Sequence, residues 1–140
     1  MGGFSMYDYA DLKRIFGSYG SIIKEEIVSD EAAYFVISPF STSDGRKLYT
    51  KIEFIKDKYD NRVAVINSAL FMKGHSSKLN SYIQNLNTEG KGGRYKISPP
   101  NVLEATKNIV LFERTTTQEL ISPWLSQMTG LQGAVSEANV

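Results

Sequence analysis

The chain's only histidine, His75, is the side chain best suited to acid–base or metal chemistry. A histidine base needs a second group that fixes its tautomer, and a metal ion needs further ligands at usable spacing. The sequence contains no cysteine, and no paired carboxylates lie near His75 along the chain. We therefore interpret His75 as a loop residue and predict that the protein uses neither a metal ion nor a cofactor.

The glycine-rich stretch EGKGGR, at residues 89–94, could bind an anion, because glycine amides can surround a phosphate and Lys91 and Arg94 lie close by. In phosphate-binding loops, however, the glycines lead into a helix. Here a predicted helix precedes the glycines and a predicted strand follows them. A hinge between helix and strand is the favoured interpretation, and a sensor that binds a small anionic ligand or nucleotide at residues 90–94 is the alternative.

A hydroxyl nucleophile is the remaining catalytic option, and three consecutive threonines at positions 115–117 are the place to look for one. Neither a Gly-x-Ser-x-Gly context nor a candidate base surrounds Thr117. Because Glu119 follows closely, the threonines suit the start of a helix. We therefore expect that the protein is not an enzyme.

Aromatic residues give the clearest hint of a binding function, since the chain holds eight Tyr, seven Phe and one Trp. Most must fill the core, but several fall where one face can stay accessible, and amphipathic aromatic side chains favour protein interfaces. We predict Trp124 and Tyr95 as partner contacts, with Tyr82 and Leu120 after them. Burial of all four side chains in the core is an equally weighted alternative.

Length and charge limit the other options. A chain of 140 residues fits one domain, which we assign to residues 1–129, followed by a flexible tail at 130–140. The net charge of +1 gives no case for binding nucleic acid. No apolar run is long enough to cross a membrane, and the amino terminus lacks the pattern of a secretion signal. We expect a cytoplasmic protein.

Helical spacing of apolar residues predicts helices at 7–19, at 79–86 and at 117–128. Ser5 or Asp8 can cap the first helix, and Ser76 or Ser77 can cap the second. Proline costs about 3 kcal/mol deep in a helix. The proline at position 123 therefore predicts that the last helix begins at residue 122 or that a turn precedes it.

Strands are predicted between the helices, at 22–28, 32–40, 48–55 and 62–70, and again at 94–98 and 108–114. The nearly continuous hydrophobicity of residues 32–40 predicts a central strand covered on both faces, with Pro39 at its end. Residues 101–107 are interpreted as strand or turn. Together these elements predict an α+β fold, an antiparallel sheet flanked by helices in the order α-β-β-β-β-α-β-β-α.

That element order resembles the type III secretion chaperone-like fold, and in particular the YbjN-like bacterial family. In that family the middle helix ends in an asparagine-bearing segment, and an arginine and a tyrosine then lead into a strand. Here Asn85 and Asn87 lie at the predicted helix end, and Arg94 and Tyr95 begin the strand. The sequence departs from the family pattern at Leu86, where an aromatic residue is usual.

The resemblance implies a protein that binds proteins rather than an enzyme. Secretion chaperones bind an extended client segment, some relatives look like assembly chaperones, and YbjN-like members are described as regulators. The resemblance thus implies a homodimeric chaperone or assembly factor, with a carboxysome shell component or a secreted effector among the possible clients. We expect the client to lie in an apolar and aromatic groove or on a strand edge.

Overall fold

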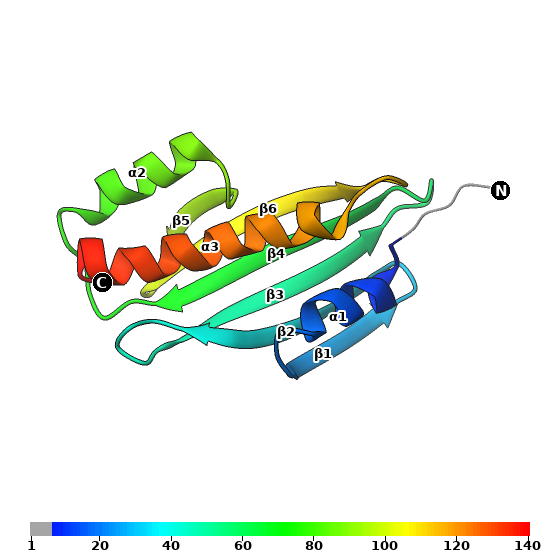
Figure 1. Cartoon of the computed structure of the whole chain (residues 1–140), viewed down its shortest axis with the longest axis horizontal. Helices are drawn as coiled ribbons and strands as arrows, with labels where there is room; N and C mark the ends of the chain where they lie inside the picture. Colours follow the sequence, from blue (N-terminus) through cyan, green and yellow to red (C-terminus); the bar gives the residue numbers. More distant parts are fainter. Residues whose placement is uncertain (1–6) are drawn as a thin grey trace.

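Six strands form one open antiparallel sheet in the order β1-β2-β3-β4-β6-β5 (Figure 1). The structure is a computed structural model that describes residues 7–140. Along the chain the elements are α1 (Tyr9–Gly17), β1 (Ile22–Ser29), β2 (Ala32–Ser41), β3 (Lys47–Lys56), β4 (Arg62–Phe71), α2 (Leu79–Glu89), β5 (Arg94–Ser98), β6 (Val102–Leu111) and α3 (Thr117–Ala138). The predicted α+β class and element order are confirmed.

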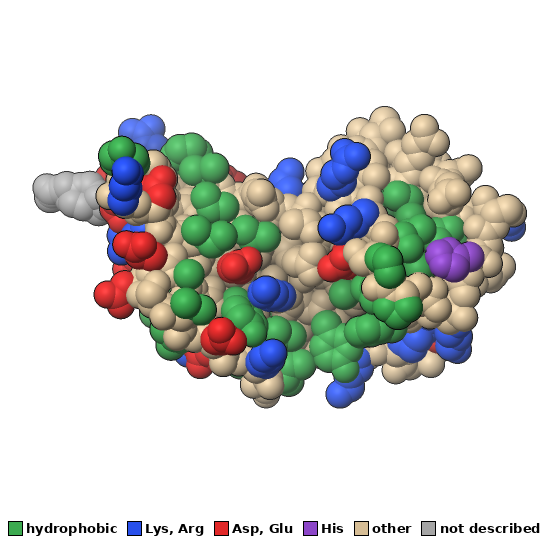
Figure 2. Space-filling view, turned by 180° about the vertical axis from the view of Figure 1, so that it is seen from behind, with side chains coloured by type: hydrophobic (Ala, Val, Ile, Leu, Met, Phe, Trp, Pro, Cys, Tyr) green, Lys and Arg blue, Asp and Glu red, His purple; other side chains and the backbone are tan. Residues whose placement is uncertain are grey.

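The helices cover one face of the sheet. α1 lies over β2 and β3, α3 lies over β4 and β6, and α2 packs beside α3 and against β5. Side chains along β3 alternate between buried positions that point to the helices and more exposed positions that point away. We call these two sides the covered face and the open face. Figure 2 shows the open face, where hydrophobic side chains are interspersed with charged ones.

The core lies between the covered face and the helices. Its largest side chain, Trp124 of α3, is fully buried and packs its ring against Phe16 of α1 and Phe40 of β2, with centroid distances of 5.5 and 5.4 Å. Burying one large apolar side chain contributes roughly 1.5–3 kcal/mol. Trp124 thereby joins α1 and α3 into one core.

The strand β2 departs from the prediction. It is covered on one face only, because Phe35 and Ile37 are fully buried while the alternate residues Tyr34 and Val36 stay partly exposed. It also continues past Pro39 to Ser41. The β2–β3 pairing is irregular between Ile37 and Phe40, which accommodates a proline that cannot donate a ladder hydrogen bond.

The first two helices begin differently from each other. Asp8 caps α1 and forms reciprocal side-chain and backbone contacts with Asp11, as one of the two expected caps. Ser5, the other expected cap, lies outside the described residues. In α2 the N-cap is Lys78, with no side-chain cap hydrogen bond, and the Ser76 hydroxyl donates instead to the Ala138 carbonyl oxygen. The predicted serine cap of α2 is therefore wrong.

The last third of the chain contains longer elements than predicted. β6 is one strand from Val102 to Leu111, because its whole length pairs with β4. α3 begins at Thr117, where Thr116 accepts a hydrogen bond from the Glu119 amide at 3.1 Å. Pro123 lies inside this helix. The expected helix start at residue 122 is thus wrong.

The prediction that residues 130–140 form a flexible tail is also wrong. α3 continues to Ala138, and Leu131, Ala134 and Ala138 are fully buried. These small and apolar residues predict little by themselves because alanine and glycine give a weak amphipathic pattern. They fold as helix because that face packs against the rest of the protein.

Candidate functional site: the groove between α2 and α3

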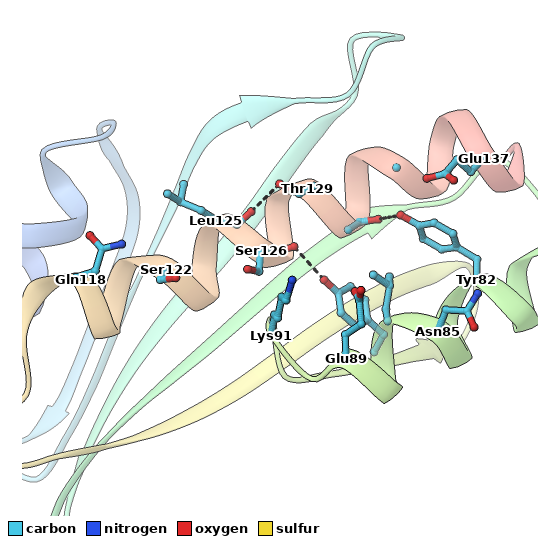
Figure 3. A pocket seen from close by; sticks show the side chains of 15 residues that line it. Tyr82, Asn85, Glu89, Lys91, Gln118, Ser122, Leu125, Ser126, Thr129 and Glu137 are labelled. Carbon is cyan, nitrogen blue, oxygen red and sulfur yellow. Dashed lines mark hydrogen bonds between the residues drawn. The ribbon is translucent and has the colours of Figure 1, made fainter.

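A groove of about 680 Å³ runs between α2 and α3, above the hinge that leads into β5 (Figure 3). Ligand-binding clefts commonly have volumes of about 300–1,000 Å³. The lining residues come from three elements and the hinge, and they are Tyr82, Asn85, Leu86, Glu89, Lys91, Gly92, Tyr95, Gln118, Ser122, Leu125, Ser126, Thr129, Gly130, Gly133 and Glu137. The groove is therefore a surface made by residues far apart in the sequence.

A buried chain of hydrogen bonds fixes the α3 wall of the groove. Trp124 Nε1 donates to Thr50 Oγ1 at 2.8 Å, and the Ser68 hydroxyl donates to Gln127 Oε1 at 2.6 Å. Because the Ser68 proton is committed to Gln127, Thr50 is the donor in the 2.9 Å contact between the two hydroxyls. The Gln127 amide then donates to carbonyl oxygens of β4 and of the hinge, at 3.0 and 2.9 Å. Each polar side-chain group in this series of hydrogen bonds has a partner.

Two tyrosines connect the opposite wall to α3. The Tyr82 hydroxyl donates to the Gly130 carbonyl oxygen at 2.7 Å, and the Tyr95 hydroxyl donates to the Ser126 carbonyl oxygen at 3.2 Å. A Cβ at Gly130 would overlap the Tyr95 hydroxyl, and one at Gly133 would overlap the Tyr82 hydroxyl. Glycine at these two positions lets the tyrosine rings approach the helix backbone.

The charged residues of the groove act on these tyrosines. Burial, together with the nearby Glu137 and Glu89 carboxylates, raises the pKa of Tyr82 to about 12. Burial is also the main cause that raises the pKa of Tyr95, with Tyr82 and Glu89 contributing. Both hydroxyls are thus protonated donors at neutral pH. Lys91 is the one cation among the lining residues.

Apolar and neutral polar side chains make up the rest of the lining. Leu86 and Leu125 offer apolar surface, and Leu125 is 38% exposed. Asn85, Gln118 and Ser122 carry amide or hydroxyl groups that can bond a peptide backbone. The arrangement can bind an extended ligand by burying apolar groups and by forming hydrogen bonds along its length.

The strand at the floor of the groove is closed along its outer edge by Asn87. The Tyr95 amide donates to Asn87 Oδ1 at 2.6 Å, and Asn87 Nδ2 donates to the Tyr95 carbonyl oxygen at 3.0 Å. These two bonds replace those of a neighbouring strand, since β5 is an edge strand. The asparagine at the end of α2 and the tyrosine of β5 are therefore in direct contact.

Glycine is required in the hinge between α2 and β5. Gly90 ends α2 with φ = 71°, and Gly93 has φ = 92°. A Cβ at Gly93 would also overlap the Thr106 carbonyl oxygen of β6. The predicted hinge is confirmed: the glycines turn the chain tightly enough to bring β5 against β6.

The four predicted contact residues occupy different environments. Tyr82 is half-buried and lines the groove, while Tyr95 also lines it but is only 3% exposed. Trp124 and Leu120 are fully buried in the core. The structure thus corrects the expectation that Trp124 keeps an accessible face, because its indole is enclosed by α1, β2 and β3.

The structure separates the two basic residues of the hinge. Lys91 lines the groove between the helices, whereas Arg94 borders a depression with Lys96, Thr106 and Asn108 on the open face. Lys91 and Arg94 therefore do not line a shared cavity.

The groove also contains residues that sequence reasoning missed. Helical spacing alone places Leu125 on the same face as Leu120 and Trp124, and the predicted tail at 130–140 contains Gly130 and Gly133. Glycines three residues apart within a helix indicate close approach of another element, which is the signal that could have identified them. Nothing local identifies tyrosines as the groups that approach.

Among residues 7–140, no group of three or more His, Cys, Asp or Glu side chains is arranged to hold a metal ion. Within the same range, no helix has the length and apolar character needed to cross a membrane. Comparison with protein families and with curated proteins gives no match to the chain.

Proposed function

We propose that this protein is a non-enzymatic binding module, a chaperone or assembly factor, which holds an extended segment of a client protein in the groove between α2 and α3. The observation that carries the proposal is the open groove itself, with Leu86 and Leu125 as apolar surface and amide and hydroxyl groups beside them. A peptide presents the same combination, apolar side chains and backbone hydrogen-bonding groups.

The fold we propose, in finer terms, is the type III secretion chaperone-like fold of the YbjN-like family. The element order and the contact between Asn87 and Tyr95 support this proposal, since the resemblance rests on those residues. The proposal extends to a cytoplasmic homodimer whose client is a secreted effector or a shell component such as that of a carboxysome. A sensor of small anions has less support, because Lys91 and Arg94 line different depressions.

The proposal can be tested with a peptide library displayed on phage and selected on the purified protein. Peptides that are enriched would be titrated by calorimetry against the wild type, Leu125→Glu and Phe112→Glu. Leu125 lines the groove, whereas Phe112 is 67% exposed and is absent from the groove lining. The two variants therefore make the same chemical change at two different surfaces.

We expect Leu125→Glu to weaken peptide binding by at least about tenfold, because a carboxylate replaces buried apolar contact worth roughly 1.4 kcal/mol or more. Phe112→Glu should bind as the wild type does. Equal binding by all three proteins would show that the peptide-binding site lies outside the groove. A library that yields no peptide above background would refute the peptide-binding function.

A further inference from the structure

The strand β1 presents a free edge of the sheet. It pairs with β2 on one side, and no described element lies along its other side (Figure 1). All of its residues after Ile22 are exposed, including Ile23 at 56%, Ile27 at 65% and Val28 at 67%. A row of unpaired backbone groups beside exposed apolar side chains is a template for pairing with another strand.

We infer that β1 pairs with β1 of a second copy of this chain, in antiparallel orientation about a twofold axis at Glu25. The sequence Ile22 to Val28, IIKEEIV, carries the inference because it is complementary to itself when read in the opposite direction. The inference deepens the homodimer of the proposed function by naming its interface, and it concerns a surface outside the groove, so that it stands or falls separately from peptide binding.

Symmetry restricts the registers that such a pair can adopt. A twofold axis perpendicular to the sheet makes the contact isologous, so that if residue i faces residue j, then j also faces i. Directly opposite residues in antiparallel strands point to the same face, and successive residues point to opposite faces. The axis must therefore pass at a residue of β1, and the central choices are Lys24, Glu25 and Glu26.

Only one of these three registers is complementary. With the axis at Glu25, each Lys24 lies opposite a Glu26, and these pairs fall within the regular part of β1. The irregular ends of the strand bring apolar residues, Ile22 and Ile23, toward Ile27 and Val28 of the second copy. An axis at Lys24 places two lysines against each other and Ile23 against Glu25. An axis at Glu26 places two glutamates against each other and Glu25 against Ile27. The charged pairs of the regular segment thus select the axis at Glu25.

The one like-charged pair of the selected register, Glu25 against Glu25, is neutralised within each chain. Lys13 Nζ lies 2.7 Å from Glu25 Oε2, and the Tyr9 hydroxyl donates to the same oxygen at 2.8 Å. These contacts, with that of Lys13 first, hold the pKa of Glu25 below its usual range. Each α1 therefore supplies a positive charge beside the axis.

The geometry of β1 also sets the length of the new ladder. The β1–β2 pairing is irregular between Ile22 and Lys24 and again between Ile27 and Ser29. The regular segment between these points contains both charged pairs of the register. Such a short ladder belongs with weak interfaces, which bury less than about 1,200 Å². The inferred dimer is a continuous sheet with one helix groove toward each outer end.

The inference is tested by charge exchange across the axis. Lys24→Glu leaves two pairs of opposed carboxylates, and Glu26→Lys leaves two pairs of opposed ammonium groups. Sedimentation velocity of the full chain measures the dimer dissociation constant. Concentrations up to about 1 mM are needed to detect a dimer whose association free energy is only about 4 kcal/mol. We expect the wild type to dimerise and each variant to dimerise at least about tenfold more weakly, since like charges directly opposite are destabilising.

Two further samples make the result specific to the register. An equimolar mixture of Lys24→Glu and Glu26→Lys restores both opposite-charge pairs in the heterodimer, as does the doubly exchanged chain in its homodimer. Lys96→Glu makes the first charge change at an exposed position of β5, the other edge strand, and should leave the wild-type constant unchanged. Circular dichroism verifies that each variant is folded.

Three outcomes would overturn the inference. The first is a wild type that stays monomeric throughout the concentration range. The second is a dimer whose dissociation constant neither single exchange changes, which would place the interface elsewhere. The third is weakening by both exchanges without recovery in the mixture and in the double variant, which would exclude the axis at Glu25.

Discussion

The two edges of the sheet are finished in opposite ways. At β5, Asn87 bonds both outward backbone groups of Tyr95, and α2 lies alongside the strand. At β1, the outward backbone has no described neighbour, and the strand instead carries three charged residues and two irregularities. At one edge a side chain forms the hydrogen bonds that a neighbouring strand would form, and at the other edge the backbone stays accessible to a further strand.

Edge protection in this fold is local and specific. A single amide side chain, held by a helix that ends two residues later, completes the hydrogen bonds of Tyr95 in β5. Charges and bulges limit what β1 can pair with but do not occupy its backbone. Variants on each side should therefore have different consequences, and four of them test the difference.

The largest effect should come from Gly93→Ala, which would open the closed edge at its hinge. The residue has φ = 92°, and an added Cβ would overlap a carbonyl oxygen of β6. We expect a loss of unfolding free energy on the order of 3 kcal/mol or more, measured by urea denaturation. Gly74→Ala is the matched control, since its Cβ would meet nothing within 4 Å, and it should stay within about 0.5 kcal/mol. Equal, small losses in both would show that the hinge tolerates a side chain.

Asn87→Ala should come next, because it makes the edge of β5 resemble that of β1. The variant leaves the amide and carbonyl groups of Tyr95 without their partner. We expect a loss of about 1–3 kcal/mol and faster hydrogen exchange at the Tyr95 amide. Asn85→Ala changes an exposed residue of the same helix in the same way and controls for helix propensity. If exchange at Tyr95 is unchanged, Asn87 is not what closes this edge.

A smaller effect is expected from Gly130→Ala, which tests how β5 is held from above. Alanine favours a helix over glycine by about 1 kcal/mol, but its Cβ would overlap the Tyr95 hydroxyl. We expect a net loss of roughly 1–2 kcal/mol, as is typical of overpacking. Tyr95→Phe removes the hydroxyl and should recover most of that loss in the double variant. A double-mutant cycle without coupling would contradict the close approach.

The smallest effect concerns the open edge and depends on pH. The pKa of Glu25 is lowered in the folded state, first by its bond to Lys13 and then by that to Tyr9. Because the pKa of Glu25 is lower in the folded state than in the unfolded state, where it is about 4.3, ionised Glu25 stabilises the fold at pH values above the unfolded-state pKa. This contribution is lost as the pH falls through the folded-state pKa. The wild type should therefore exceed Glu25→Gln in stability at pH 7, with the gap closing in acid. Urea titrations of dilute protein measure it, and a gap independent of pH would contradict the ion pair.

The order of helices and strands can be predicted from the sequence because each element shows its own local pattern of apolar residues. Leu12, Ile15 and Phe16 mark one helix face, and alternation along β3 marks one strand face. Prediction from local pattern fails where contacts with residues far away in the sequence decide which side chains are buried. Gln127 is fully buried because it bonds Ser68 and two distant carbonyl groups, and nothing in its own neighbourhood indicates this.

The candidate site was predictable to a similar degree. The sequence predicts Tyr82 and Tyr95 as contact residues, and both line the groove. The exposure of Leu125 and the helical state of Gly133 were not predicted, because each depends on how α2 packs beside α3. Helical spacing defines a face, but the packing of the partner helix decides which part of that face stays open.

Trp124 has a practical consequence, because it is the only tryptophan in the chain. Its indole donates to Thr50 of β3 and packs against Phe16 of α1, Phe40 of β2 and the ring of Tyr19. The tryptophan fluorescence therefore comes from one site, where α3 meets α1 and the sheet. Detachment of α1 alone, without loss of the sheet, would change the emission spectrum, so that one unlabelled optical signal can follow how the fold assembles.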